Sequence, residues 1–166
     1  MREILVYLGF GSNQGNSVVN IKRAINLLIA TKKIKLESFS NFYLSPPLGN
    51  LPQPNYINAA GSFVTNSSPN ELLKQTQSVE LQLGRSKVRK QWDSRPIDID
   101  ILIYDRITIN HEYLTIPHPE IKNRSFVLLP LSELKSDIVI PGQGKVSELM
   151  DKIALSNCKR INDAQR

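Results

Sequence analysis

The sequence contains little cysteine and no long apolar run. A single cysteine, Cys158, excludes an internal disulfide framework and is typical of a protein kept in a reducing cytoplasm. No apolar stretch reaches the roughly 20 residues that a bilayer-spanning helix needs. The apolar run 4–10 is short and leads into a Gly-Ser-Asn turn, which is not the pattern of a signal peptide. With no repeats or low-complexity segments either, the sequence predicts an ordinary globular protein without a membrane partner.

The composition indicates one globular domain with a basic surface. The 166 residues are 40% hydrophobic and 22% charged, which is enough for a single domain, 1–166, with a real core. A net charge of +6 favours an anionic partner, without choosing among nucleic acid, a membrane surface and a phosphorylated small molecule. One loop concentrates five cationic side chains: Arg85, Lys87, Arg89, Lys90 and Arg95.

The order of the predicted elements is that of an α+β fold. Apolar and β-branched runs predict strands over 3–9, 34–44, 56–65 and 95–104. Two helices lie between them, one capped by Ser17 and one that begins with a capping box at Ser68 and stops at Gly84. This strand-helix-strand, strand-helix-strand order predicts a ferredoxin-like βαββαβ core. C-terminal additions, namely a hairpin near 110–111 and helices near 125–134 and 145–155, would complete a three-layer α/β/α arrangement.

The stretch RPIDIDILIY, residues 95–104, carries the most informative charges. Side chains alternate along a strand, so its four isoleucines would share the face that packs on the helices. Asp98 and Asp100 would project together from the open face, about 7 Å apart along the strand. Two carboxylates that close repel each other, and they need a positive partner. Mg²⁺ prefers a few carboxylates together with phosphate oxygens, and the basic loop supplies cations for the rest of a triphosphate.

Three other interpretations of these charges stay open at this point. The aspartates could belong to a merely solvated sheet face. A sheet with aromatic residues and basic loops also describes RNA-binding modules, although carboxylates on that face would repel phosphate. A different Mg²⁺-dependent nucleotidyl or phosphoryl transferase would use the same pair of carboxylates. Nucleic-acid binding and the identity of the nucleotide product separate these alternatives.

Seven ordered segments of the chain match the pattern of one known family: GSNQGN (11–16), SPPLG (45–49), NYINAA (55–60), TQSVELQLGR (76–85), RPIDIDIL (95–102), LTIPHPEIKNRSF (114–126) and PL (130–131). The sequence thereby resembles the 6-hydroxymethyl-7,8-dihydropterin pyrophosphokinases of folate biosynthesis. The resemblance implies an ATP- and Mg-dependent enzyme that transfers the β,γ-pyrophosphoryl unit to the pterin hydroxymethyl oxygen and releases AMP. It further implies a cytoplasmic monomer that associates functionally with dihydropteroate synthase and binds no nucleic acid.

The resemblance assigns residues to the nucleotide side of the reaction. Asp98 and Asp100 match the family's ligands for two Mg²⁺ ions, and Arg85 and Arg95 match cations that stabilise the transferring group. These four form the implied catalytic set. The implied ATP-binding residues are Gln77, Glu80, Arg85, Lys87, Arg95, Ile101 through its backbone, Thr115 and His118. Without the resemblance, Glu80 would be taken as a solvated helix residue and His118 as part of a turn.

The pterin side follows from residue chemistry as well as from the resemblance. A flat, polar heterocycle is best held by aromatic stacking and by amide hydrogen bonds at its edge. Tyr56 and Phe126 match the family's stacking pair, and Asn58 offers a donor and an acceptor. The implied pterin-binding set is completed by Ser45, Pro46, Leu48 and a lid tryptophan, Trp92. Taken alone, Tyr56 and Phe126 could equally be core aromatics, and Asn58 a strand-edge amide.

The basic loop departs from the family pattern. Lys87 and Gln91 occupy positions that are usually arginine, and Asp93-Ser94 replaces a Gly-Pro pair. Arginine binds phosphate with two parallel donors whereas lysine is a point charge, so we expect weaker phosphate clamping. We also expect residues 85–95 to be mobile in the free protein, with the arginines at both ends moving inward when MgATP binds and Trp92 closing over the pterin.

Overall fold

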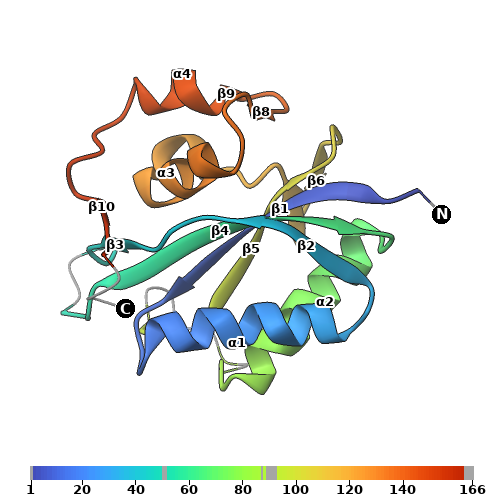
Figure 1. The fold of residues 1–166 in the computed structure, drawn as a ribbon, viewed down its shortest axis with the longest axis horizontal. Coiled ribbons are helices and arrows are strands. Elements are labelled where there is room, and N and C mark those ends of the chain that lie inside the picture. The colour runs from blue at the N-terminus through green and yellow to red at the C-terminus, as the bar shows by residue number, and fades with distance from the viewer. Residues whose placement is uncertain (1, 50–51, 87, 89–92, 163–166) are drawn as a thin grey trace.

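Three layers organise the protein: two helices, a sheet and two further helices (Figure 1). The computed structural model describes residues 2–49, 52–86, 88 and 93–162. Helices α1 (Ser17–Ala30) and α2 (Pro69–Gln82) lie on one face of the sheet, and α3 (Ser125–Leu134) and α4 (Val146–Met150) lie over the other. The predicted three-layer α/β/α arrangement is therefore confirmed. Within the described ranges, no helix has the length and apolar character to cross a membrane.

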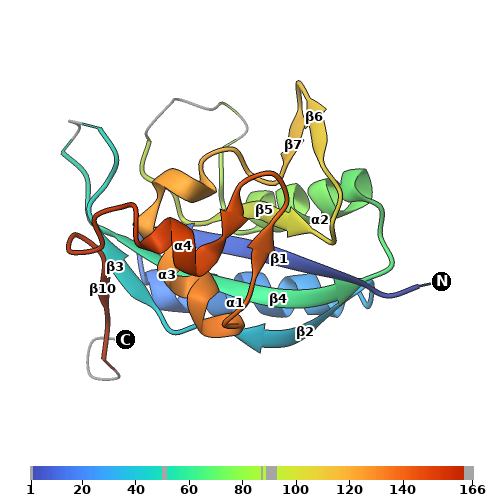
Figure 2. The ribbon, with the colours of Figure 1, turned by 90° about the horizontal axis from the view of Figure 1, so that it is seen from above.

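The central sheet has the strand order of the predicted core. From one edge to the other it contains β10 (Lys159–Arg160), β3 (Tyr43–Ser45), β4 (Tyr56–Thr65), β1 (Ile4–Ser12) and β5 (Asp98–Tyr104), while β2 (Ile34–Phe39) pairs with the far half of β4. All of these pairs are antiparallel. The order β2-β4-β1-β5 is that of a ferredoxin-like βαββαβ unit, and it is easiest to follow in Figure 2.

The strand predicted over 34–44 is divided into β2 and β3. Residues 40–42 leave the ladder at this point, and the hydroxyl of Ser40 accepts the N–H of Ala60 at 2.9 Å in place of a backbone carbonyl. Phe39 and Tyr43 are four positions apart, but their partners Gly61 and Asn58 on β4 are only three positions apart. One extra residue on the outer strand is a bulge, which bends the chain and ends the regular pairing.

Local signals set the starts of the two long helices. α2 begins as predicted, because Ser68 accepts the N–H of Glu71 while the Glu71 carboxylate accepts the N–H of Ser68. α1 differs by one residue from the prediction. Asn16 is the capping residue, with its side chain accepting a backbone N–H from the first turn, and Ser17 is the first helical residue.

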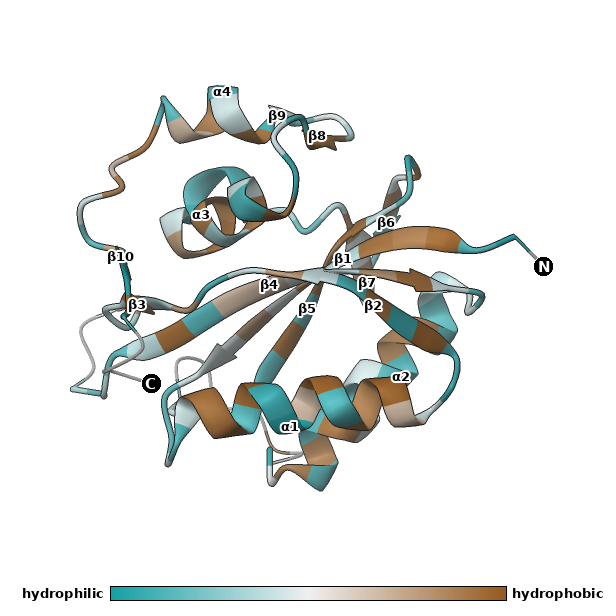
Figure 3. Cartoon of the chain, in the orientation of Figure 1, coloured by the Kyte–Doolittle hydropathy of each residue, from teal (hydrophilic) through white to brown (hydrophobic). Residues whose placement is uncertain are grey.

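The four isoleucines of the aspartate strand do not share one face. The first three pack into the core beneath α1 and α2, whereas Ile103 packs with α3 on the opposite side (the apolar bands are brown in Figure 3). The cause is a bulge, since Tyr7 and Leu8 of β1 pair with Ile103 and Ile101, which leaves Leu102 as an extra residue. One inserted residue reverses the in-and-out pattern beyond it. The predicted isoleucine face is therefore wrong at Ile103.

The C-terminal additions follow the prediction except at their end. β6 (Ile109–His111) and β7 (Leu114–Ile116) form the expected hairpin, and a short 3₁₀ turn, η1 (Ile121–Asn123), leads into α3. A second small hairpin joins β8 (Val139–Ile140) to β9 (Gly144–Lys145). α4 ends at Met150 and not near residue 155, because the chain then returns to the sheet, where β10 pairs with β3.

Candidate active site

Side chains of four strands meet on the α3 face of the sheet. β1 continues to Ser12, three residues beyond its predicted end, so that Gly9 lies opposite Asp100 and Gly11 lies between Asp98 and Asn58. A Cβ atom at Gly9 would come within 3.2 Å of the Leu102 side chain. One at Gly11 would come within 3.5 Å of the Asn58 amide oxygen. The two glycines therefore leave open space above the sheet, between the aspartates and the asparagine.

A cavity of about 280 Å³ lies over this part of the sheet, and we call it the strand cavity. Its walls include all the described residues that were predicted to hold the pterin: Ser45, Pro46, Leu48, Tyr56, Asn58 and Phe126. Asn58 is only 4% exposed, and its Nδ2 donates to Ser45 Oγ at 2.8 Å. Tyr56 and Phe126 are only half-buried and face the cavity, so they are not plain core aromatics.

A second cavity, of about 360 Å³, lies between α2, the edge of β5 and the turn that precedes η1; we call it the loop cavity. It gathers the described residues that were predicted to bind ATP: Gln77, Glu80, Arg85, Arg95, Ile101, Thr115 and His118. Four side chains line both cavities, and these are Arg95, Asp98, Asp100 and Arg124. Molecules held in the two cavities would thus meet at the two aspartates.

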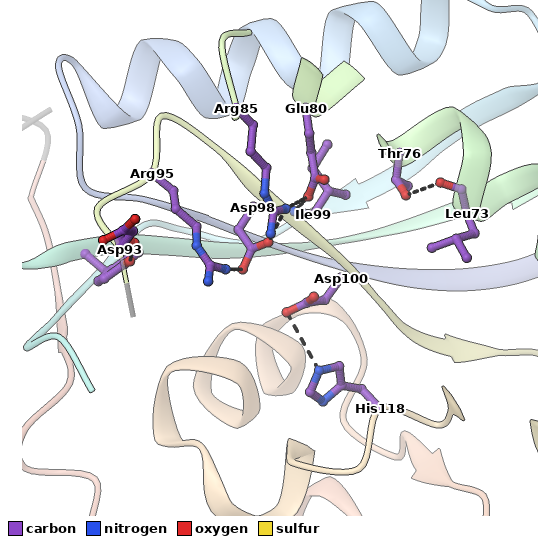
Figure 4. A network of polar contacts seen from close by, with 11 residues as sticks. Leu73, Thr76, Glu80, Arg85, Asp93, Arg95, Asp98, Ile99, Asp100 and His118 are labelled. Carbon is purple, nitrogen blue, oxygen red and sulfur yellow. Dashed lines mark hydrogen bonds and ion pairs between the residues drawn. The ribbon is translucent and has the colours of Figure 1, made fainter. Parts of the chain in front are cut away.

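An ion-pair network connects α2 to the first aspartate of the strand (Figure 4). Glu80 is 4% exposed, contacts Arg85 and accepts the N–H of Ile99 at 2.7 Å. Arg85 in turn donates to Asp98 Oδ1 at 2.5 Å, and Arg95 donates to Oδ2 at 3.0 Å. Burial opposes the charge of Arg85, but Asp98 and Glu80 outweigh it and raise the pKa of the guanidinium. The interpretation of Glu80 as a solvated helix residue is wrong.

Both arginines of the network face the site through contacts with the chain's own carboxylates. The Arg85 side chain is only 10% exposed, between Glu80 and Asp98. The inward movement that was expected of Arg85 and Arg95 is therefore not needed, since Asp98 already holds them. The other predictions for this loop concern Lys87, Gln91 and Trp92, which lie outside the described residues.

Asp100 has a different environment from Asp98. Its nearest described basic side chain is His118, whose Nε2 lies 4.0 Å from Oδ2. Burial, and then the charge of Arg124, lower the pKa of His118 to about 4, so the imidazole is neutral at pH 7. Its Nδ1 accepts the N–H of Glu120 at 3.2 Å, which places the ring proton on Nε2, toward Asp100. Burial, and then the charge of Asp98, raise the pKa of Asp100. The charge of Arg124 opposes this shift, but no described Lys or Arg side chain forms an ion pair with Asp100 within 4.0 Å.

The pair of aspartates suits a divalent cation that is shared with a ligand. Among the described residues, no three His, Cys, Asp or Glu side chains are grouped closely enough to hold a metal by themselves. Asp98 and Asp100 nevertheless lie on one face of β5 and line both cavities. Hard carboxylate oxygens with an open side suit Mg²⁺, which usually takes its other ligands from water and phosphate. The residues therefore fit Mg²⁺ bound together with a phosphorylated ligand.

Arg124 is a site residue that the sequence reasoning missed. It immediately precedes α3, lines both cavities, and its guanidinium carbon lies 5.7 Å from the centre of the Phe126 ring. That distance is within the range of a cation–π contact. The arginine belongs to one of the matching segments, KNRSF, but no local pattern distinguishes it from the surface cations nearby. Only the packing of α3 on the sheet brings it to the aspartates.

Known proteins match this chain over most of its length. The family model described as 7,8-dihydro-6-hydroxymethylpterin-pyrophosphokinase (HPPK) matches residues 7–136. The 2-amino-4-hydroxy-6-hydroxymethyldihydropteridine pyrophosphokinase of Haemophilus influenzae is 37% identical over 96% of this chain and 99% of its own. The protein of that name from Methylorubrum extorquens is 38% identical over 93% and 97%. Among solved structures, Plasmodium falciparum HPPK-DHPS superposes with a TM-score of 0.75 at 16% identity, over 96% of this chain and 49% of that chain.

The fold and the two joined cavities define a transferase with a ferredoxin-like α+β core. The chain belongs to the HPPK family. It is an enzyme of folate biosynthesis that transfers pyrophosphate to hydroxymethyldihydropterin. This assignment replaces the RNA-binding and solvated-face interpretations. The Plasmodium falciparum chain, at 16% identity, supports the fold alone.

Proposed function

We propose that the enzyme takes the pyrophosphoryl group from ATP in the presence of Mg²⁺, transfers it to the 6-hydroxymethyl oxygen of the dihydropterin and releases AMP. One observation carries the proposal: the loop cavity and the strand cavity meet at Asp98 and Asp100. ATP in the first and the pterin in the second would bring the β-phosphorus and the attacking oxygen together at this boundary. Holding both reactants in one geometry is itself a large part of catalysis.

The pterin would be held by its faces and by its edge. Tyr56 of β4 and Phe126 of α3 both line the strand cavity, where each would stack on the pterin ring. The Nδ2 group of Asn58 is engaged by Ser45 Oγ at 2.8 Å and by the carbonyl of Tyr43 at 3.4 Å. We therefore assign the Asn58 Oδ1 atom, near Gly11, to the donors of the pterin edge. Pro46 and Leu48 would close the apolar side of the same cavity.

The nucleotide would be held mainly by charge. Arg85 and Arg95 would stabilise the negative charge that develops on the transferring group, as preorganised cations do. Glu80 would act through Arg85, since its carboxylate joins that guanidinium to the backbone of β5. Gln77, Thr115, His118 and the Ile101 backbone would line the nucleoside end. Lys87 and Trp92 keep the roles that their positions in the sequence suggest, as phosphate ligand and lid.

Asp98 and Asp100 would hold Mg²⁺, and we propose two ions. Mg²⁺ bound there withdraws charge from phosphate oxygens and lowers the pKa of a coordinated hydroxyl. The chain's own contribution is to keep both carboxylates on one face of a strand, with Arg85 and Arg95 on the far side of Asp98. Arg124 supplies a third cation at the same boundary, so the site can balance the charge of a triphosphate.

The wider setting is also a proposal. The Plasmodium falciparum protein is named HPPK-DHPS, and by analogy with that name we propose that this enzyme associates with dihydropteroate synthase. The single cysteine, Cys158, is buried and forms no disulfide, which agrees with a cytoplasmic enzyme.

Product analysis tests the proposed reaction. We expect AMP and the pterin diphosphate from incubation with ATP, Mg²⁺ and reduced hydroxymethylpterin, and no product in excess chelator. Asp98→Asn should abolish the reaction, whereas Asp151→Asn, at an exposed carboxylate after α4, should leave it unchanged. Formation of ADP with the pterin monophosphate would show a phosphoryl transferase instead, and product without any divalent metal would contradict the Mg²⁺ assignment.

A further inference from the structure

Asn13 joins three segments of the chain at the rim of the site. It directly follows β1 and is only 4% exposed. Its backbone N–H donates to the carbonyl of Arg95 at 3.1 Å, and its Oδ1 accepts the N–H of Arg95 at 2.8 Å and the hydroxyl of Ser94 at 3.1 Å. On its other side, Nδ2 donates to Gln53 Oε1 and to the Pro54 carbonyl, both at 3.2 Å. One buried side chain thus ties the end of β1 to two loops.

The two loops that Asn13 joins serve different cavities. Gln53 lines the strand cavity, on the side expected to receive the pterin. Arg95 lines both cavities and holds Asp98. The Arg95 backbone both accepts a hydrogen bond from Asn13 and donates one to it, as a paired strand residue does. These two bonds fix the position of the Arg95 Cα atom, from which the side chain extends. Asn13 is buried and its bonds are partly shielded from water, so losing one partner leaves a poorly solvated polar group unsatisfied.

Ser94 adds a bond that this chain's departure from the family pattern provides. The Asp93-Ser94 pair lacks the stiffness of Gly-Pro, but its serine hydroxyl donates to Asn13 and the carbonyl of Asp93 accepts from the Tyr56 hydroxyl at 3.3 Å. Hydrogen bonds here restrain a backbone that lacks a proline ring. The residues at 93–95 are therefore held on both sides, by the end of β1 and by the wall of the strand cavity.

We propose that Asn13 is a positioning residue of the transfer reaction. It holds Arg95 beside Asp98 and couples the position of Arg95 to the position of the loop that carries Gln53. The hydrogen bond from Ser94 supports this arrangement. This inference rests on the proposed function. The two halves of the amide do separate work: the oxygen holds the Arg95 segment, and the nitrogen holds the Gln53–Pro54 segment.

Asparagine can do this because the amide at the end of its short side chain contains both a donor and an acceptor. Asn13→Asp keeps the acceptor for Arg95 and Ser94, but it can give no hydrogen to the Pro54 carbonyl, which only accepts. Asn13→Ala removes both halves. Ser94→Ala removes one bond and leaves the backbone pair of Asn13 and Arg95 intact. The three variants therefore separate the two links.

Steady-state kinetics and binding calorimetry on the full chain test the proposal. We expect Asn13→Ala to lower kcat roughly 10²-fold, the loss that a misplaced catalytic group can cause, with the KM for ATP changed far less. Asn13→Asp should recover much of that kcat while the KM for the pterin stays raised. Ser94→Ala should lose about threefold to tenfold, as for one hydrogen bond. In an Arg95→Ala background, Asn13→Ala should have little further effect on kcat. Asn20→Ala is the matched control, because its side-chain bonds go to the Gln14 carbonyl at 2.8 Å and the Ser12 hydroxyl at 3.5 Å and to neither of the two loops.

Several results would overturn the inference. An Asn13→Ala enzyme with kcat within about threefold of the parent would do so. So would an equal loss with and without Arg95, which would place the effect of Asn13 elsewhere. If thermal unfolding shows that Asn13→Ala is not folded, then Asn13→Asp and Ser94→Ala decide the question, and unchanged kinetics in both would reject the positioning role. A parent protein that forms no AMP would reject the proposed function itself, a result distinct from any variant's failure.

Discussion

The strand cavity and the loop cavity share four residues, yet they are built in different ways. The floor of the strand cavity comes from alternate positions of neighbouring strands, so the ladder register alone aligns Asn58, Gly11 and Asp98. The loop cavity takes its polar and charged groups from a helix end, a loop and a turn, which carry Glu80, Arg85 and the neutral His118. A sheet presents shape with little freedom, whereas loops and helix ends bring charges together from distant parts of the chain.

The same contrast separates the two aspartates. Asp98, on the side of the loop network, is bound by Arg85 and Arg95. Asp100, two residues further along the strand, has a neutral histidine at 4.0 Å and no described cation within ion-pair distance, and its pKa is raised by burial and by Asp98 although Arg124 opposes this shift. Two carboxylates of one strand thus have opposite electrostatic environments. The difference teaches that strand position brings them together, while the surrounding loops decide how each behaves.

Replacing each aspartate by asparagine tests the difference between them and should have the largest effect on turnover. Either Asp98→Asn or Asp100→Asn should lower kcat by about 10²–10³-fold or more, as when one preorganised electrostatic group is lost. Their stabilities should move in opposite directions in metal-free buffer. Asp98→Asn leaves two guanidinium groups short of a partner and should cost about 1–2 kcal/mol, since the Asp98 side chain is 25% exposed and the Arg85 side chain 10% exposed. Asp100→Asn removes a repelled carboxylate and should stabilise the fold.

Urea unfolding of the three proteins in excess chelator measures these changes. If repulsion between the carboxylates were the only effect, both variants would be as stable as the parent or more stable. Because Asp98 is paired with two arginines, we expect this result for Asp100→Asn alone. Loss of stability in both variants to the same extent would show that the two carboxylates are equivalent. Near-normal turnover of either at saturating Mg²⁺ would contradict their assignment as metal ligands.

Truncating the walls of the strand cavity should separate it from the loop cavity. Asn58→Ala and Phe126→Ala should each weaken pterin binding by about 1–3 kcal/mol, since one loses an amide contact and the other a stacking face. ATP binding should change little, because neither side chain lines the loop cavity. Isothermal calorimetry with a pterin analogue and with a non-hydrolysable nucleotide measures both. Equal loss of the two affinities would mean that the cavities are not independent.

A smaller effect concerns the attachment of α3, which carries Phe126 of the strand cavity, to β3 and the residues just before it. Glu133 of α3 contacts the Tyr43 hydroxyl and accepts from the backbone N–H and side chain of Asn41, at 2.7 and 3.0 Å. Burial alone would raise the pKa of Glu133, but the bonds from Tyr43 and Asn41 outweigh it and lower the pKa. A carboxylate whose pKa is lowered on folding stabilises the fold at pH values above its ordinary pKa, near 4.5. This contribution disappears as the pH falls through the lower pKa of the folded state.

The wild-type protein should therefore exceed Glu133→Gln in free energy of unfolding at pH 7, and this advantage should shrink as the pH falls below about 4.5. Because the carboxylate is exposed, the difference should be no more than about 1 kcal/mol. Denaturant unfolding at pH 7 and at pH 3.5 measures it, with Glu148→Gln on α4 as a control carboxylate. A constant gap between wild type and variant at the two pH values would show that Glu133 contributes no titrating contact.

Several features of this protein were determined by the sequence alone, because each depends on spacing within one segment. The alternation in 98–100 places both aspartates on one face, and the Ser68–Glu71 capping box starts α2. The order of strands and helices predicted the ferredoxin-like core. Each described residue that the matching segments assign to the pterin lines the strand cavity, and each one that they assign to ATP lines the loop cavity. Periods of two and of 3.6 residues are visible without the fold.

Only the tertiary structure decided the contacts that join distant segments. Asn13 and Arg95 are 82 residues apart, Glu133 and Asn41 are 92 apart, and Arg124 reaches the aspartates only because α3 packs on the sheet. The bulge at Leu102, which moves Ile103 to the other face, likewise depends on how β5 pairs with β1. Such contacts depend on register and packing between elements, and local spacing contains no information about either.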